Sequence, residues 1–358
     1  MNPTLTIDLS ALSYNFRSIS GKAGLPRVAC VVKNNAYGLG AVPVVEALYA
    51  AGCRAFFVAY PDEGAEIRPA APDAAVYVLQ GFDATDAGIC ARSRLIPVLS
   101  NKGQWDAWRL LSPHAERPAI QVETGLNRLG FSYDELAAMP EQERRQFGLV
   151  LSHLACADEP DHPMNRRQRD NLIKIKPLFK DTPFSLSASD GFYLGPDFHF
   201  DLVRIGASLY GLNPVAGRPK ENKNVIGITA SVIHTHTIQA GETAGYGAAF
   251  IAARPTTLAT ISIGYGDGIF RSFSPKGKVF FDIDGKRSAA PLAGRVSMDN
   301  ITADVTDVPG DVLGKRAVIL DAQFDCDDMA RCAGTIGYEV LNAVGHGIRY
   351  RREWISEK

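Results

Sequence analysis

The stretch VACVVKNNAYGLG, residues 28–40, joins a buried strand to a turn that begins with a lysine. Residues 28–32 form a run of small and β-branched side chains, typical of a strand buried on both faces. Lys33 follows directly, and then come Asn34, Asn35 and glycines, which favour a turn. A charge at the end of a buried strand costs free energy unless it is paired, exposed or used in chemistry. Taken alone, such a lysine is usually a solvated surface residue.

The same pattern recurs through the first two-thirds of the chain, as a short apolar run, a polar turn and a segment with helical spacing. The further runs are AFFVAY (55–60), VYVLQ (76–80), IPVLS (96–100), AIQVE (119–123), LVLSHL (149–154), FSLSA (184–188) and DLVRI (201–205). Strands that alternate with helices and are buried on both faces predict a parallel sheet. Eight runs predict an N-terminal (β/α)8 TIM-like barrel over residues 1–225, although a doubly wound open sheet gives the same local signals.

The pattern changes after a connection rich in Pro, Gly and Lys at 213–225. Alternating strands broken by Gly and Asp turns follow, at 228–243, 256–268 and 278–290. They predict a C-terminal mainly-β domain over residues 226–358. The opening segment is also strand-like, and its first residues, to about residue 8, are expected to pair with that domain.

Composition excludes several classes of protein. The chain has 358 residues, is 46% hydrophobic and has a net charge of −1, so it lacks the basic face of a nucleic-acid-binding protein. No apolar run approaches the ~20 residues that span a bilayer. The opening residues lack the pattern of a secretory signal, and six scattered cysteines without a CxxC motif read as reduced thiols. These features predict a cytoplasmic protein with no membrane or nucleic-acid partner.

Two short motifs resemble metal sites. The segment HTH at 234–236 puts two histidines on one face of a strand, but no third ligand is evident nearby, and a sheet face is the commoner explanation. The segment DCDDMARC at 325–332 is better explained as a helix N-terminus, where carboxylates cap the helix. We therefore expect no metal.

In a (β/α)8 barrel, catalytic groups lie at the C-terminal ends of the strands, and phosphate sites follow the seventh and eighth strands. Lys33 ends the first strand. After the seventh and eighth runs, Ser189 offers a hydroxyl, and Gly206 and Ala207 offer backbone N–H groups to an anion. A lysine forms a Schiff base with pyridoxal phosphate, whose ring nitrogen usually faces a charged side chain. Arg204 can fill that position, or it can form a structural ion pair.

These residues closely resemble the alanine racemases, a family of pyridoxal-phosphate enzymes. The resemblance runs in order along nearly the whole chain. It includes VVKNNAYGLG, VETGLNRLGF (122–131), LSHLACADE (151–159), DLVRIGASLYG (201–211), GYGAAF (245–250), IGYGDG (263–268), GRVSMDN (294–300) and GYEVLNAVG (337–345). The lysine motif is shared with other barrel-type pyridoxal-phosphate proteins. The tyrosine and SMDN motifs of the β domain are more specific.

The resemblance implies a role for each matched residue. Lys33 binds the cofactor and acts as one base, and Tyr246 acts as the second base on the opposite face of the substrate, since racemisation needs two. The family places this tyrosine in the partner's site, which implies a homodimer with shared sites. The remaining expected contacts are Tyr37, His153, Ser189, Arg204, Gly206 and Ala207 for the cofactor, and Arg128, Met298 and Tyr265 for the substrate.

The chain departs from the family at several positions. Asn34 replaces the usual alanine. Gln121 stands where many members have a carbamylated lysine, and its amide oxygen is expected to accept from Arg128. The imidazole of His346 replaces a larger side chain of some members, which leaves a broader-specificity racemase, for example of serine, as an alternative.

Three further classes are weighed against the racemase. An amino-acid decarboxylase of the same architecture typically has a longer glycine-rich phosphate loop and a catalytic cysteine in the β domain. A pyridoxal-phosphate carrier lacks the β domain that contains Tyr246 and Met298. A binding protein on an inactive barrel does not need Lys33 and Tyr246.

Overall fold

The computed structural model describes residues 2–22, 27–111, 116–215, 217–274 and 276–356. They divide into two compact units. The barrel unit comprises Leu12–Ala36 and Gly40–Asn222, and the β unit comprises Met1–Ala11, Tyr37–Leu39 and Lys223–Lys358. The short segment Tyr37–Leu39, which lies just beyond Lys33 in the chain, therefore belongs to the β unit.

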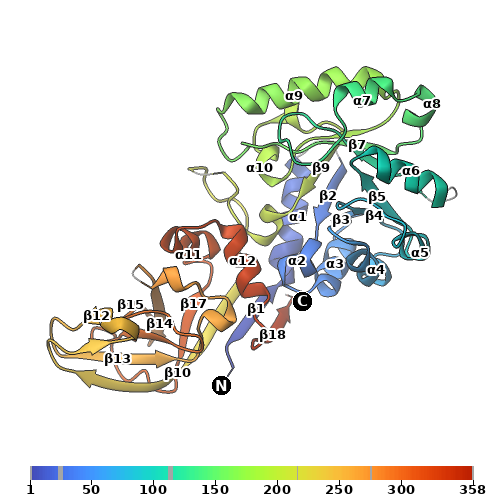
Figure 1. Ribbon diagram of the computed structural model, residues 1–358. Helices are drawn as coiled ribbons and strands as arrows, with labels where there is room; N and C mark the ends of the chain where they lie inside the picture. Colours follow the sequence, from blue (N-terminus) through green and yellow to red (C-terminus); the bar gives the residue numbers. More distant parts are fainter. Residues whose placement is uncertain (1, 23–26, 112–115, 216, 275, 357–358) are drawn as a thin grey trace. The chain divides into compact units, whose positions relative to one another are not determined.

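Eight parallel strands form the sheet of the barrel unit, in the order β8-β7-β6-β5-β4-β3-β2-β9 (Figure 1). They are β2 (Arg27–Val31), β3 (Ala55–Val58), β4 (Ala75–Val78), β5 (Leu95–Leu99), β6 (Ala119–Gln121), β7 (Leu149–Leu151), β8 (Phe184–Ser185) and β9 (Leu202–Ile205). β9 pairs with β2, and it also meets the β8 segment, where the Asp201 and Arg204 N–H groups donate to the carbonyls of Phe184 and Ser187 at 2.9 and 3.0 Å. The predicted (β/α)8 barrel is confirmed, and the open sheet is excluded.

Helices connect the strands of this ring. They are α1 (Leu9–Lys22), α3 (Ala41–Ala50), α4 (Pro61–Ile67), α5 (Ala87–Arg92), α6 (Lys102–Leu111), α7 (Tyr133–Ala138), α8 (Glu141–Arg144), α9 (Pro163–Ile175) and α10 (Ser189–Phe192). None of the described helices is both long and apolar enough to cross a membrane.

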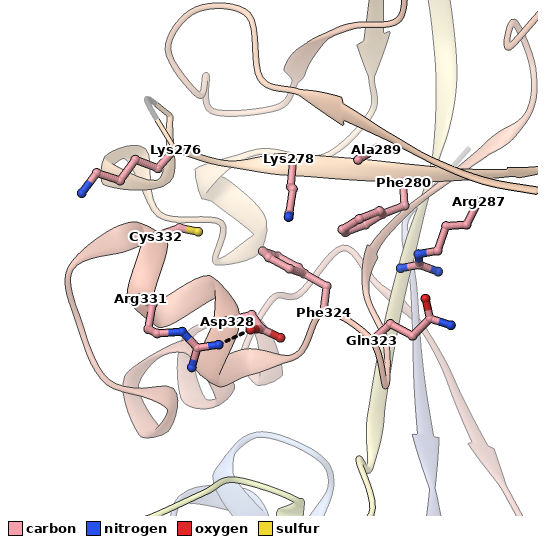
Figure 2. A pocket seen from close by; sticks show the side chains of 10 residues that line it. All are labelled: Lys276, Lys278, Phe280, Arg287, Ala289, Gln323, Phe324, Asp328, Arg331 and Cys332. Atoms are coloured by element: carbon pink, nitrogen blue, oxygen red, sulfur yellow. Dashed lines mark hydrogen bonds and ion pairs between the residues drawn. The ribbon is translucent and has the colours of Figure 1, made fainter. Parts of the chain in front are cut away.

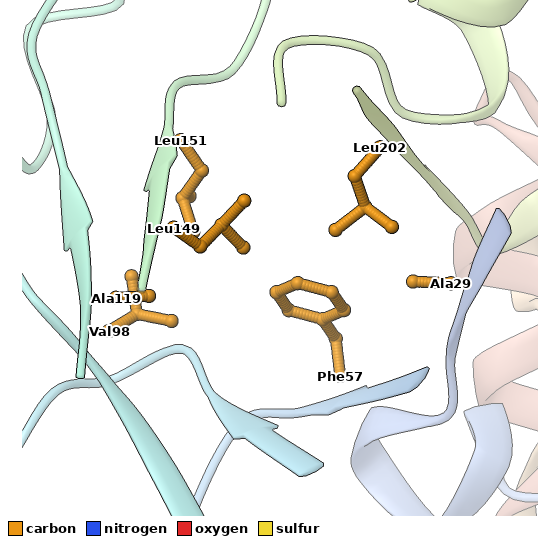
Figure 3. Close-up of a cluster of buried hydrophobic side chains, with 7 residues drawn as sticks. All are labelled: Ala29, Phe57, Val98, Ala119, Leu149, Leu151 and Leu202. Carbon is orange, nitrogen blue, oxygen red and sulfur yellow. The ribbon is translucent and has the colours of Figure 1, made fainter. Parts of the chain in front are cut away.

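The centre of the barrel is filled by side chains from six of its strands, which converge in Figure 3. They are Ala29, Phe57, Val98, Ala119, Leu149, Leu151 and Leu202. The Phe57 ring also stacks on Tyr77, with centroids 4.5 Å apart. A packed interior of this kind leaves no channel through the barrel, so functional groups are confined to the strand ends.

The β unit consists of mostly antiparallel strands and two helices. They are β1 (Thr4–Asp8), β10 (Ile226–Ile238), β11 (Thr243–Ala244), β12 (Phe250–Ile251), β13 (Thr256–Ile261), β14 (Lys278–Ile283), β15 (Lys286–Pro291), β16 (Ile301–Asp304), β17 (Arg316–Leu320), β18 (Arg351–Ile355), α11 (Cys326–Ala333) and α12 (Gly337–Gly345). β1 lies between β10, to which it is antiparallel, and β18, to which it is parallel. Asp325 caps α11 by accepting from the N–H groups of Asp327 and Asp328, which confirms the predicted helix N-terminus.

Candidate active site

Lys33 begins α2 (Lys33–Tyr37), a single turn of unusual backbone. Asn34, Asn35, Ala36 and Tyr37 have φ of 54°, 53°, 52° and 57°, so four consecutive residues are left-handed. This conformation costs roughly 1–2 kcal/mol per residue for ordinary side chains, and asparagine tolerates it best. The Asn35 side chain supports the turn, because its Oδ1 accepts from the Ala41 N–H at 2.7 Å. Asn34, the departure from the family's alanine, therefore stands where asparagine suits the backbone.

The electrostatics of Lys33 are set by burial and by two charged neighbours. Burial lowers the pKa of Lys33, the positive charge of Arg128 lowers it further, and the carboxylate of Glu63 raises it. A lower pKa leaves more of the amine unprotonated at neutral pH. Only the unprotonated amine can act as a nucleophile or a base, so this environment suits both roles.

Arg204 lies on β9 and is buried, with only 5% of its surface exposed. Its Nη1 donates to Ser185 Oγ at 2.6 Å, and its Nη2 donates to the carbonyls of Ser152 and Leu186 at 2.5 and 3.2 Å. In the described part of the chain it forms no ion pair, and its Nε–H has no acceptor. Burial lowers the pKa of Arg204 to about 10, and Asp190 opposes this effect, so the guanidinium stays protonated at neutral pH. Arg204 is thus a fixed cation with a spare N–H donor. This suits a partner of the cofactor's ring nitrogen better than the alternative role, a structural ion pair.

His153 follows β7, which ends at Leu151, earlier than the predicted run. The Gln168 side chain binds the backbone here, accepting from the Ala155 N–H at 2.8 Å and donating to the His153 carbonyl at 2.9 Å. These bonds hold the backbone of the segment that follows the strand. Burial lowers the pKa of His153 to about 3, helped by the positive charges of Arg204, Arg128 and Lys33. The imidazole is therefore neutral among three cations.

We expect His153 in the cofactor-free protein to stay neutral from pH 8 down to pH 5, because its pKa lies below this window. The check is an NMR titration of protein labelled at its histidines, with the signal assigned by its loss in His153→Asn. Added free histidine serves as the reference and protonates near pH 6.5. A His153 signal that titrates together with the free amino acid contradicts this expectation.

The expected anion site lies after β8 and β9, and its polar atoms are buried. Ser189 Oγ accepts from the N–H groups of Gly206 and Ser208 at 3.0 and 3.3 Å, while Ala207 begins a short 3-10 helix. Ser208 Oγ is buried and has no partner among the described residues. A buried hydroxyl left unpaired is costly, and a phosphate oxygen would satisfy it. The donors present therefore fit the phosphate of pyridoxal phosphate.

Arg128 lies in the turn after β6, and it is exposed. The expected hydrogen bond from Arg128 to the Gln121 amide oxygen is absent from the described residues. Gln121 instead donates through its Nε2 to the Leu129 carbonyl at 3.3 Å. Gln121 therefore holds the loop, and its amide oxygen accepts no hydrogen bond from Arg128 among the described residues. Glu123 also holds the loop, by accepting from the Asn127 N–H at 2.8 Å.

Tyr246 belongs to the β unit and lies at the tip of the β11–β12 hairpin, with 69% of its surface exposed. Gly245 and Gly247 flank it with φ of 76° and 71°. A Cβ on Gly245 would come within 3.0 Å of the Arg295 nitrogen, so only glycine allows this close approach of two loops. This exposure excludes the alternative that Tyr246 is a core aromatic of the β domain.

Tyr265 and Met298 lie on neighbouring loops of the β unit, and both are exposed. The Tyr265 N–H donates to the Ser297 carbonyl, and the Gly266 N–H to the Met298 carbonyl, both at 2.9 Å. Arg349 joins the same loops. It forms a bidentate ion pair with buried Asp267, at 2.7 Å for each bond, and donates to the Met298 carbonyl at 3.1 Å.

Tyr37 and His346 both lie in the β unit. A Cβ on Gly38, next to Tyr37, would come within 2.4 Å of His346 Nδ1, so the imidazole lies directly against this segment. Arg352 and Trp354 of β18 fix the segment by donating to the carbonyls of Gly38 and Leu39, at 2.5 and 2.9 Å.

Sequence patterns do not mark four further features of the site: Glu63, Gln168, Ser185 and the Asp267–Arg349 pair. Each acts on a partner far away in the chain, so no local pattern marks it. Only Glu63 leaves a partial signal, as the third residue of a helix that begins with Pro61.

A separate hollow of about 600 Å³ lies in the β unit between β14, β15 and α11 (Figure 2). Four cations, Lys276, Lys278, Arg287 and Arg331, and one carboxylate, Asp328, line it. Arg287 pairs with Asp321 at 2.7 Å, Arg331 pairs with Asp328, and the Lys278 ammonium lies 5.5 Å from the ring centres of Phe280 and Phe324. The hollow is therefore a mainly cationic surface of the β unit, whereas Lys33 and Arg204 belong to the barrel unit.

A barrel with a lysine beyond its first strand, a buried arginine on its last strand and phosphate donors between them defines a class of protein: barrel enzymes that hold pyridoxal phosphate on a lysine. Models of the "Alanine racemase, N-terminal domain" and "Alanine racemase, C-terminal domain" match residues 7–214 and 225–354. The chain belongs to the alanine racemase family, whose members depend on pyridoxal phosphate.

Individual relatives agree with the family models. The chain is 40% identical to an alanine racemase of Rhizobium meliloti, covering 98% of this chain and 96% of the relative. It is 41% identical to a catabolic alanine racemase of Agrobacterium fabrum, covering 98% and 92%. A solved alanine racemase of Bartonella henselae with covalently bound pyridoxal phosphate has a TM-score of 0.91 and 34% identity, covering 99% and 100%.

Proposed function

We propose that this protein interconverts L-alanine and D-alanine with pyridoxal phosphate as its cofactor. The observation that carries the proposal is the placement of Lys33, whose pKa is lowered, just beyond β2, and of protonated Arg204, which forms no ion pair among the described residues, on the neighbouring strand β9. Its relatives at 40% and 41% identity are alanine racemases. When bound, the cofactor supplies an electron sink that acidifies the Cα–H of an amino acid.

The residues of the chain divide the remaining tasks. Lys33 binds the cofactor and moves a proton at one face of Cα. Arg204 donates through its free Nε–H to the ring nitrogen and keeps that nitrogen unprotonated, because arginine does not release its proton. Ser189, Ser208 and the Gly206 and Ala207 amides hold the phosphate. Arg128 binds the substrate carboxylate, which a guanidinium can pair bidentately.

The second base is Tyr246, which a second copy of this chain supplies in a homodimer. Its 69% exposure supports this assignment, because a tip tyrosine that projects from the surface is free to enter another subunit. Met298 binds the substrate carboxylate together with Arg128, Tyr265 limits the size of the substrate, and Tyr37 contacts the phosphate. We further propose a cytoplasmic enzyme that supplies D-alanine for peptidoglycan, and its six free cysteines suit a reducing compartment.

The test is chiral analysis of alanine after incubation of the purified protein with pyridoxal phosphate and L-alanine. Equal amounts of the two enantiomers, reached from either starting enantiomer, support the proposal. Bound cofactor without formation of D-alanine would contradict the proposal. Serine supplied in the same assay tests the broader-specificity alternative, and release of CO2 tests the decarboxylase.

We expect the activity to be insensitive to bicarbonate, because Gln121 cannot be carbamylated. The measurement compares turnover in CO2-free buffer with turnover in the same buffer after bicarbonate is added at constant pH and ionic strength. The matched variant Gln121→Lys places an amine at this position. Clear activation of the unmodified protein contradicts the expectation.

Arg349→Lys is expected to lower kcat/KM for alanine by about tenfold or more, because Arg349 joins the loops that carry Tyr265 and Met298. Each hydrogen bond to a charged group contributes about 1.5–3 kcal/mol to holding these loops. The lysine keeps the charge that buried Asp267 needs, but it cannot bind the carboxylate bidentately and reach Met298 as well. Steady-state kinetics provide the check. Arg254→Lys, which alters an exposed pair with Asp307, is the control and should leave kcat/KM unchanged. Equal kcat/KM values for Arg349→Lys and Arg254→Lys would contradict a role of Arg349 in holding the loops of Tyr265 and Met298.

A further inference from the structure

The left-handed turn beyond Lys33 needs support from outside itself, because two of its four left-handed residues, Ala36 and Tyr37, are of residue types that disfavour this conformation. Its first amide, that of Asn34, has its partner in another part of the barrel. The Asn34 N–H donates to Glu63 Oε1 at 2.5 Å. Glu63 lies near the start of α4, 29 positions further along the chain.

The other oxygen of Glu63 is equally engaged. Its Oε2 accepts from the Ala59 N–H at 2.6 Å and from the Tyr60 N–H at 3.2 Å. These two amides lie where the chain leaves β3 and enters α4, so the carboxylate is fixed to the end of the strand next to β2. One side chain therefore links the lysine turn to the rim of the barrel through three backbone amides.

Two charged groups shift the pKa of Lys33. The positive charge of Arg128, in the turn after β6, lowers it, and the carboxylate of Glu63, on α4, raises it. Glu63 is the one carboxylate among them, and it favours the protonated amine, in opposition to Arg128 and to burial.

We propose that Glu63 is a positioning residue for Lys33: its carboxylate holds the first amide of the strained turn in place, and this hydrogen bond keeps a negative charge one residue away from Lys33. This assignment rests on the proposed function only in giving Lys33 a catalytic role. The positioning role of Glu63 is argued from burial, hydrogen bonds and charge, and none of these depends on a bound cofactor.

The test uses the cofactor-free full-length protein and three variants, Glu63→Gln, Glu63→Ala and Glu66→Gln. Glu66 lies on the same helix, is exposed and serves as the matched control. Glutamine keeps one acceptor oxygen of the two and removes the charge, whereas alanine removes both oxygens and the charge. Circular dichroism establishes that each variant is folded, and Glu63→Gln keeps the test decisive if Glu63→Ala does not fold.

The first readout is the rate at which Lys33 reacts with acetic anhydride as a function of pH, followed by mass spectrometry of its peptide. We expect the curve to move to lower pH in both Glu63 variants, because the charge that favours the protonated amine is gone. The second readout is amide hydrogen exchange over residues 34–37. Exchange should be about tenfold faster or more in Glu63→Ala, and closer to the unmodified protein in Glu63→Gln.

Labelling curves and exchange rates that match those of Glu66→Gln in both Glu63 variants overturn the proposal. A purely structural role for Glu63 would accelerate exchange but leave the labelling curve of Glu63→Gln in place, and this result also overturns the charge assignment. Neither readout requires turnover, so a failure to racemise alanine leaves this test standing. In the active enzyme, Glu63→Gln is expected to lower kcat more than it changes KM, as loss of alignment of a base predicts.

Discussion

Lys33→Ala is expected to abolish racemisation, with a loss of at least about a thousandfold in kcat. A positioned base alone contributes about 10²–10⁴-fold, and this residue also holds the cofactor. The measurement is chiral analysis of alanine, together with the cofactor absorbance that remains with the protein after gel filtration. The substitution shortens a side chain at a strand end, outside the packed interior of the barrel, so the fold should persist.

Two controls sharpen this result. Lys102→Ala removes an exposed lysine of α6 whose ion pair with Asp106 is superficial, and it should leave the activity unchanged. Lys33→Arg keeps a positive charge but supplies no nucleophilic amine, and it should be as inactive as Lys33→Ala. Retention of more than about one per cent of the activity in either Lys33 variant contradicts the role of the amine.

Tyr246→Phe is expected to lower turnover by about a hundredfold or more, because only the phenol oxygen can exchange a proton with the substrate. Stability should change by less than about 0.5 kcal/mol, since the side chain is exposed. Thermal unfolding and steady-state kinetics on one preparation separate the two effects. A variant that turns over at the unmodified rate contradicts the two-base proposal.

Mixing the two inactive variants tests whether the site is shared. If Tyr246 acts in the partner's site, a hybrid dimer of Lys33→Ala and Tyr246→Phe subunits contains one complete site and one doubly defective site. Random reassociation of equal amounts should then restore about a quarter of the original activity, because half of the dimers are hybrids with one working site each. If both bases come from one chain, every site lacks one of them, and the mixture stays inactive.

The barrel could be predicted from the sequence because buried parallel strands give a strong local pattern of apolar residues. Each of the eight apolar runs overlaps a strand. The order of the strands along the chain also located Lys33 and Arg204 at strand positions from which barrel enzymes work. The left-handed turn was beyond prediction. Asn34 and Asn35 indicate a turn, but Ala36 and Tyr37 adopt φ above 50° only because the surrounding fold holds them there.

Contacts between distant positions set the other limit. Asp267 and Arg349 are 82 positions apart, and nothing near either residue marks its partner. The expected contact between Gln121 and Arg128 was wrong for a related reason. The positions are close in the chain, yet the reach of a glutamine side chain relative to the turn it supports depends on backbone geometry that residue types do not reveal.

The pairing of β1 with both β10 and β18 has a consequence for how the protein is made. β1 leaves the ribosome before the barrel strands, and β18 follows about 340 residues later. At typical rates of synthesis, on the order of half a minute separates them. Throughout this time β1 has an open edge and an apolar face without a partner, while the barrel strands that follow it can already associate. The β unit therefore completes its sheet only after the whole barrel unit has been synthesised, and until then the open edge of β1 can pair with other chains.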